Sequence, residues 1–222
     1  MVAFAVKYGA MSNQIATTST NSRAGLVKRG RKLEYFTLGY NFLEGLLSVG
    51  AGLLAGSVAL VGFGVDSFIE SLSGGILLWR LQGDKGEERE HLALRLVGVS
   101  FLVLAAYVAF DAGKSLIRHE PPEASYLGIA ITVLSLFIMP ILARAKRQVG
   151  TELDSRALQA DAKQTDICVY LSFILLAGLG LNALFGWWWA DPAAALVMVP
   201  IIAKEGFAAL RGEACGCGDS CS

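Results

Sequence analysis

The chain has 222 residues, 54% of them hydrophobic, and its mean hydropathy is +0.53. The 19 basic and 19 acidic residues cancel, so the net charge gives no indication of a nucleic-acid partner. The hydrophobic share exceeds that of ordinary soluble domains, and it is gathered in long stretches with few charges. Composition therefore predicts an all-α polytopic membrane protein.

The chain divides by composition into three parts. Residues 1–32 are polar and basic, with a Ser/Thr-rich run, and are predicted to be a disordered cytoplasmic segment. Their first apolar run is too short for the core of a signal peptide. Residues 33–211 are predicted to form one transmembrane domain, and residues 212–222 a Cys-rich cytoplasmic tail.

Six membrane crossings fit within the transmembrane domain. A helix needs about 20 apolar residues to cross about 30 Å of hydrocarbon. The stretches 35–81 and 167–210 are each long enough for two crossings, while 92–117 and 125–143 fit one each. We therefore predict a six-helix bundle, with helices near 33–54, 58–81, 92–117, 125–145, 156–182 and 192–210.

The basic residues predict the orientation. They gather before the first helix, between the second and third, and between the fourth and fifth, whereas the opposite side has only Lys114 and Arg118. The positive-inside rule then places both termini in the cytoplasm. We expect a multi-pass protein of a bacterial-type plasma membrane.

Asp66 and Glu70 are the strongest chemical signal. They lie four residues apart near the middle of the second predicted helix, so both carboxyl groups share one helix face. An acidic residue at the centre of a bilayer costs at least about 2.5 kcal/mol on insertion scales. A bound divalent cation, or protons when that cation leaves, would offset this cost. The alternative is a pair that lies near the membrane surface or is satisfied by neighbouring polar groups.

The fifth predicted helix carries a second set of polar residues. Asp161, Gln164 and Cys168 share one face by their spacing and offer a carboxylate, an amide and a sulfur. With Asp66 and Glu70 they could complete a metal site. For Asp161, a polar helix start at the membrane interface explains the residue equally well, and Cys168 could be an apolar filler.

Four further acidic or polar residues allow only weaker predictions of their roles. Asn41 and Glu44 share a face of the first helix, and Glu44 is either a proton relay, a secondary ligand or a helix-contact residue. Asp191 precedes Pro192 and is predicted to cap the sixth helix. Asp166 lies off the face of Asp161 and receives no explanation from the sequence.

The tail holds three thiols, at Cys215, Cys217 and Cys221. Thiolates select soft or borderline metals, but three cysteines without a histidine do not close a structural zinc site. We expect transient metal capture, or else an ordinary disordered tail.

Three segments resemble the cation diffusion facilitator family. Residues 55–70 are similar to its second helix, which supplies half of the transport site; residues 155–168 resemble its Ser-x-x-Leu-x-Ala-Asp-Ala-x-His-x-x-x-Asp run; and residues 186–196 resemble its Trp-x-Asp-Pro-x-Ala-Ala-Leu run. The order matches, and the resemblance covers residues 35–211. It implies a six-helix efflux domain and a homodimer.

The resemblance also implies a ligand set. Asp66 and Glu70 fall on the family's two ligands of the second helix, Gln164 on its His and Cys168 on its Asp. Those last two are departures that remove charge, and the missing His puts zinc in particular in doubt. Asp161 falls on the aspartate of the Ala-Asp-Ala run. The chain stops soon after Arg211, so it resembles the short branch that lacks a cytoplasmic domain.

We therefore predict a transporter that exports a divalent metal from the cytoplasm in exchange for protons. Zinc, manganese, iron, cobalt and cadmium are not distinguished, and no cofactor is expected. The alternative is a non-transporting metal sensor or accessory subunit of the same fold. No arrangement of residues typical of an intramembrane enzyme is present in the sequence.

Overall fold

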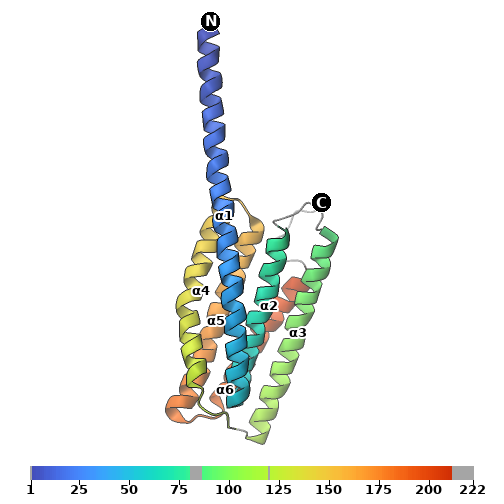
Figure 1. The fold of residues 1–222 in the computed structure, drawn as a ribbon. Coiled ribbons are helices and arrows are strands. Elements are labelled where there is room, and N and C mark those ends of the chain that lie inside the picture. Colours follow the sequence, from blue (N-terminus) through green and yellow to red (C-terminus); the bar gives the residue numbers. More distant parts are fainter. Residues whose placement is uncertain (1, 81–86, 120, 212–222) are drawn as a thin grey trace.

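The computed structural model describes residues 2–80, 87–119 and 121–211, and this part of the chain is helical throughout apart from its connections (Figure 1). It confirms the all-α fold and contains α1 (Val2–Ala55), α2 (Val58–Arg80), α3 (Glu87–Arg118), α4 (Tyr126–Glu152), α5 (Arg156–Phe185) and α6 (Ala190–Leu210).

Three helices differ in extent from the prediction. α1 begins at Val2 rather than near residue 33, and its first part projects beyond the bundle (Figure 1). Residues 1–32 contain no proline, and a helix already formed in the membrane propagates without a new nucleus. α3 also begins earlier, at Glu87, and α4 continues to Glu152. The division of the chain into three parts stays a prediction.

The helices form a closed ring around a packed interior. Each runs antiparallel to the one before it, and α1 projects from the upper end of the bundle as Figure 1 is drawn. The most extensive contacts join α1 with α2, α3 with α6 and α4 with α5, and further contacts join α1 with α4, α2 with α3 and α5 with α6. α2 also touches α5 and α6 across the ring, so its residues lie centrally.

Glycines allow α1 and α2 to pack closely. A Cβ atom on Gly45 of α1 would lie 2.8 Å from the carbonyl oxygen of Gly64, and one on Gly64 of α2 would lie 2.7 Å from the backbone nitrogen of Val49. A Cβ on Gly52 would meet Val61 in the same way. Small residues let transmembrane helix backbones approach in this manner. This close approach places polar side chains of α1 beside those of α2.

Asp191 has a capping role, but not the predicted one. Its carboxylate accepts a 2.6 Å hydrogen bond from the Ser57 hydroxyl, and its second oxygen lies 3.5 Å from the backbone nitrogen of Ala59. Both partners belong to the start of α2, while α6 begins at Ala190 with no side-chain cap. The prediction of a cap on the sixth helix was therefore wrong. The folded ring brings Asp191 to the start of α2. The first N–H groups of that helix have no partner within it, and they attract a buried carboxylate.

The exterior of the bundle is apolar. Large side chains such as Leu54, Phe110 and Phe173 are exposed by 87%, 74% and 67%. Soluble monomers do not expose apolar surface on this scale. Within the described residues, five helices are long and apolar enough to cross a membrane: the relevant parts of α1, α3, α4, α5 and α6. The chain is thus a multi-pass integral membrane protein.

Candidate functional site

Asp66 and Glu70 both point into the bundle. They are 4% and 3% exposed, and the preceding Phe63 and the intervening Ser67 are fully buried on the same helix. One oxygen of Glu70 accepts a 3.3 Å hydrogen bond from the Thr165 hydroxyl of α5, and the other has no hydrogen-bond partner. The pair is therefore interior to the bundle.

Glu44 of α1 lies beside this pair. The Ser67 hydroxyl lies 3.0 Å from one Glu44 carboxylate oxygen and 3.1 Å from the carbonyl oxygen of Phe63, so its single proton can serve either acceptor. The other Glu44 oxygen is buried without a partner. Glu44 interacts electrostatically with both Asp66 and Glu70. Three carboxyl groups thus face the same interior region between α1 and α2.

α5 adds a sulfur to this region. Cys168 is 1% exposed, and its thiol lies near enough to Glu70, Glu44 and Asp66 to interact with them electrostatically. Gln164, one turn earlier, is half-buried. Thr165 is fully buried and supplies the contact to Glu70 that the sequence did not indicate. The structure therefore brings Asp66, Glu70 and Cys168 together, and Gln164 lies one turn before Cys168 on α5.

Asp161 belongs to an adjoining cluster of ions, formed with Lys146 of α4 and Glu34 of α1. Lys146 donates a hydrogen bond to Asp161, and its Nζ lies 3.3 Å from a carboxylate oxygen of Glu34. The Glu34 contact is an ion pair by distance but lacks hydrogen-bond geometry, so both Glu34 oxygens still lack hydrogen-bond partners. Side chains of Lys146 and Glu34 are each 1% exposed.

The ion cluster lies one helical turn above the acidic group, toward the upper end of the bundle. A Cβ on Gly74, one turn after Glu70, would lie 3.6 Å from a Glu34 oxygen. On α5, the hydroxyl of Thr165 lies 3.2 Å from the carbonyl oxygen of Asp161, one turn before it. Asp161 is therefore already engaged by a cation of the chain itself, and its role as a metal ligand stays a prediction.

The sequence carries signals for Lys146 and Glu34, two members of the ion cluster. Lys146 lies in the basic segment predicted to join the fourth and fifth helices, but it continues the buried stripe of α4 through Ser135, Met139 and Leu142. Extending the fourth helix past residue 145 would have revealed it. Glu34 continues the spacing of Asn41 and Glu44 toward the N-terminus. For Thr165 the sequence offers no such signal.

Asp166 now has an explanation. It forms an ion pair with Arg147 of α4, and the two side chains are 37% and 52% exposed. Exposed pairs of this kind contribute about 0–1 kcal/mol. Asp166 therefore belongs to the surface where α4 and α5 meet, and not to the interior site.

Across the described residues, no group of three or more His, Cys, Asp and Glu side chains stands in an arrangement that could hold a metal ion. Buried polar atoms without hydrogen-bond partners are nevertheless concentrated in the interior between α1 and α2, on Glu34, Asn41, Glu44, Ser48 and Glu70. Leaving such an atom unpaired costs about 1–3 kcal/mol. The interior between α1 and α2 is therefore suited to polar guests such as cations or water. The predicted thiols at Cys215, Cys217 and Cys221 lie outside the described residues.

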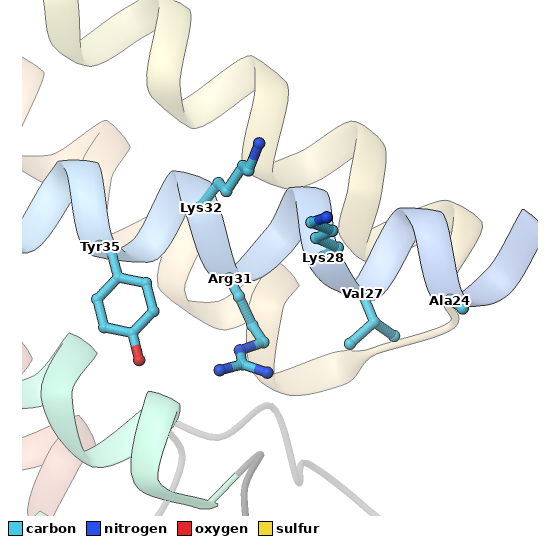
Figure 2. A pocket seen from close by; sticks show the side chains of 6 residues that line it. All are labelled: Ala24, Val27, Lys28, Arg31, Lys32 and Tyr35. Atoms are coloured by element: carbon cyan, nitrogen blue, oxygen red, sulfur yellow. The ribbon is translucent and has the colours of Figure 1, made fainter.

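A groove on α1 lies outside this region. It has a volume of about 410 Å³ and is lined by Ala24, Val27, Lys28, Arg31, Lys32 and Tyr35 (Figure 2). Figure 2 shows the lysine and arginine side chains along this part of α1, all from a single helix. Three cationic side chains oppose the binding of a metal cation. The groove is therefore not the cation site.

Comparison with known proteins finds a matching family model and several relatives. Residues 36–213 match the family model of the cation efflux transmembrane domain. The chain is 27% identical to an uncharacterised transporter of Methanocaldococcus jannaschii over 75% of the chain and 62% of that protein. It is 26% identical to the cation-efflux pump FieF of Shewanella oneidensis, over 50% of the chain and 36% of the pump.

A third relative is the cadmium, cobalt and zinc/H(+)-K(+) antiporter of Bacillus velezensis, which is 24% identical over 76% of the chain and 56% of the antiporter. The chain thus spans between 36% and 62% of the length of these three relatives.

Proposed function

Because the chain belongs to the cation efflux family, as a match over most of its length shows, we propose that it carries divalent metal cations out of the cytoplasm in exchange for protons. Transport, and not catalysis, is the proposed activity. The names of the pump and antiporter relatives support cation movement, and the antiporter's name supports protons as the coupling ion.

The observation that carries the proposal is the burial of Asp66 and Glu70 in the centre of the bundle. Intramembrane acidic residues are expensive, and they mark ion pathways in transporters. Two carboxylates on one helix face provide hard oxygen ligands for a divalent cation. When protons replace the cation, the carboxylates lose their charge and their affinity for metal, so cation release and proton uptake are coupled.

Cys168 and Gln164 are the proposed ligands from α5, and Asp161 stands as the fifth predicted ligand, held at present by Lys146. A thiol favours soft or borderline metals such as zinc or cadmium over manganese. We therefore propose zinc, cobalt and cadmium as the first substrates to test. Alternating access would arise from motion of α1 and α2 relative to the rest of the ring.

The proposed orientation places the upper end of the bundle in the cytoplasm. This end carries Lys28, Arg29, Arg31 and Lys32 on α1, and the positive-inside rule assigns such clusters to the cytoplasmic side of a plasma membrane. A homodimer in the lipid bilayer completes the proposal, and it rests on the family resemblance alone.

The test is cation flux in proteoliposomes under a pH gradient, for zinc, cobalt, cadmium, iron(II) and manganese. Wild type is compared with the isosteric variant Asp66→Asn/Glu70→Gln, and with Asp166→Asn as a matched control at a surface carboxylate. We expect flux of at least one metal in wild type and in the control, and its loss in the double variant.

Two results would contradict the proposal. Flux that persists in the double variant would move the site away from α2. No flux of any metal by folded wild type would instead favour a membrane metal sensor or an accessory subunit. Reversal of the pH gradient tests the coupling ion, because proton exchange predicts that flux then slows or stops.

A further inference from the structure

α1 carries a buried polar stripe along the middle of its membrane-spanning part. Its members are Glu34, Thr37, Asn41, Glu44 and Ser48, and their spacing of three and four residues places them on one helix face. They are exposed by 0%, 4%, 0%, 3% and 0%. From Glu34 to Ser48 the stripe spans about 21 Å at 1.5 Å per residue. We call it the α1 polar stripe.

The α1 polar stripe holds most of the unsatisfied polar atoms in the described interior. Seven buried side-chain atoms there lack hydrogen-bond partners: six belong to Glu34, Asn41, Glu44 and Ser48, and the seventh is an oxygen of Glu70. Thr37 alone is satisfied within its own helix, by a 2.9 Å bond to the carbonyl oxygen of Leu33. Unpaired polar groups inside a membrane protein line the regions that ions or water enter.

Glu44 occupies the point where this stripe meets the site on α2. It accepts a hydrogen bond from Ser67, the residue that follows Asp66 in the chain. It also interacts with the carboxyl groups of Asp66 and Glu70. Asn41, one turn above it, lies close enough to Glu70 to influence that carboxyl group. An amide oxygen and a carboxylate oxygen, both unpaired, are thus available on α1 at the level of Glu70.

The chemistry of the site calls for this contribution. Gln164 and Cys168 leave α5 without a carboxylate inside the site, while Asp161 is held by Lys146. Asp66 and Glu70 supply two carboxylates, and the proposed α5 ligands, the thiol of Cys168 and the amide of Gln164, add no third oxygen anion of the kind that divalent cations favour. The Glu side chain has three torsions, so Glu44 and Glu70 can rotate toward a shared cation.

We propose that α1 supplies ligands to the transported cation, with Glu44 as a third carboxylate and Asn41 as an amide ligand. This inference rests on the proposed function. It differs from the set predicted from the sequence because it places the compensating charge on α1 rather than on α5.

The experiment measures equilibrium binding of zinc, cobalt or cadmium to the purified full chain in detergent by calorimetry. The Asp66→Asn/Glu70→Gln variant retains any binding by the tail thiols, so the binding that it loses defines the membrane site. Glu44→Gln keeps the size of the side chain and an oxygen that can accept the Ser67 bond. Ser67→Ala removes that bond but keeps the Glu44 carboxylate. We expect Glu44→Gln to weaken the membrane site by at least about tenfold, and Ser67→Ala by less than about threefold.

The outcomes separate the two proposals. Unchanged affinity in Glu44→Gln, or equal loss in Glu44→Gln and Ser67→Ala, would overturn the ligand role and indicate a contact between helices. If wild type and Asp66→Asn/Glu70→Gln bind alike, no membrane site exists at Asp66 and Glu70, and the proposed function loses its site as well. Asn41→Leu, which keeps the volume but removes the amide, is expected to weaken the membrane site about three- to tenfold, and unchanged binding would remove Asn41 from the set.

Discussion

Ser57 donates a 2.6 Å hydrogen bond to Asp191, 134 positions later in the chain, and so joins the start of α2 to the start of α6. The same hydroxyl lies 3.1 Å from the backbone nitrogen of Leu60, as expected of an N-cap residue. Asp191 is 1% exposed and was expected from the sequence to cap its own helix. This link fixes the lower end of α2, the helix that carries Asp66 and Glu70.

Replacing Asp191 is expected to destabilise the fold. Asp191→Ala leaves the Ser57 hydroxyl and an α2 N–H group buried without their acceptor, at a cost of about 1–3 kcal/mol. The measurement is the thermal unfolding midpoint in detergent. Asp111→Ala is the control, because Asp111 is part of a half-exposed 4.0 Å pair with Lys114, which contributes about 0–1 kcal/mol. Equal midpoints for the two variants would contradict the capping role.

Removing the buried lysine is expected to cost more than removing its exposed neighbour. Lys146→Met leaves Glu34 and Asp161 buried without a compensating charge, and breaking a buried ion pair in this way costs about 3–5 kcal/mol. Arg147→Met removes only the exposed pair with Asp166 and is expected to cost about 0–1 kcal/mol.

A second variant separates charge from packing in that cluster. Glu34→Gln/Lys146→Met removes one acidic and one basic group together, so it is expected to recover part of the stability lost in Lys146→Met. Thermal unfolding in detergent again provides the measurement. Failure of the added Glu34→Gln change to recover any stability would show that the lysine acts by packing and not by its charge.

The thiol of Cys168 is expected to influence metal preference. Cys168→Ser replaces a soft sulfur ligand by an oxygen, so affinity for cadmium is expected to fall more than affinity for manganese. Competition binding of the two metals to wild type and variant checks this. Because Cys168 is 1% exposed, the fold of the Cys168→Ser variant must be verified. Cys168→Ala serves as a second variant, which removes the sulfur but keeps the packing apolar. A cadmium-to-manganese ratio unchanged in both variants would exclude the sulfur as a ligand.

Close packing of α1 on α2 is expected to tolerate no side chain at Gly45 or Gly64. Gly64→Ala would place a Cβ 2.7 Å from the backbone nitrogen of Val49. The backbones of α1 and α2 must then move apart, which lowers the stability of the fold by about 1–3 kcal/mol. Gly50→Ala is the matched control, since a Cβ there meets nothing within 4 Å and alanine favours a helix by up to about 1 kcal/mol. Thermal midpoints that fall equally, or rise for both, would contradict this packing.

The sequence by itself determined the fold class, and it identified Asp66 and Glu70 as the proposed centre of the site. Hydrophobic stretches of membrane-spanning length and the spacing of Asp66 and Glu70 are local properties, since a bilayer requires a helix of fixed length and a helix places residues four apart on one face. The helix order and its alternating direction followed from the same pattern of apolar and basic segments.

Only the tertiary structure decided which polar groups meet. Asp161 faces Lys146 because α4 continues as a helix past the predicted end and packs on α5, and Glu44 reaches Ser67 because glycines bring α1 against α2. Asp191 caps α2 rather than α6 because the closed ring of helices brings the start of α6 beside the start of α2. Periodicity reveals the buried face of a helix, but the identity of the neighbour on that face depends on how six helices pack together.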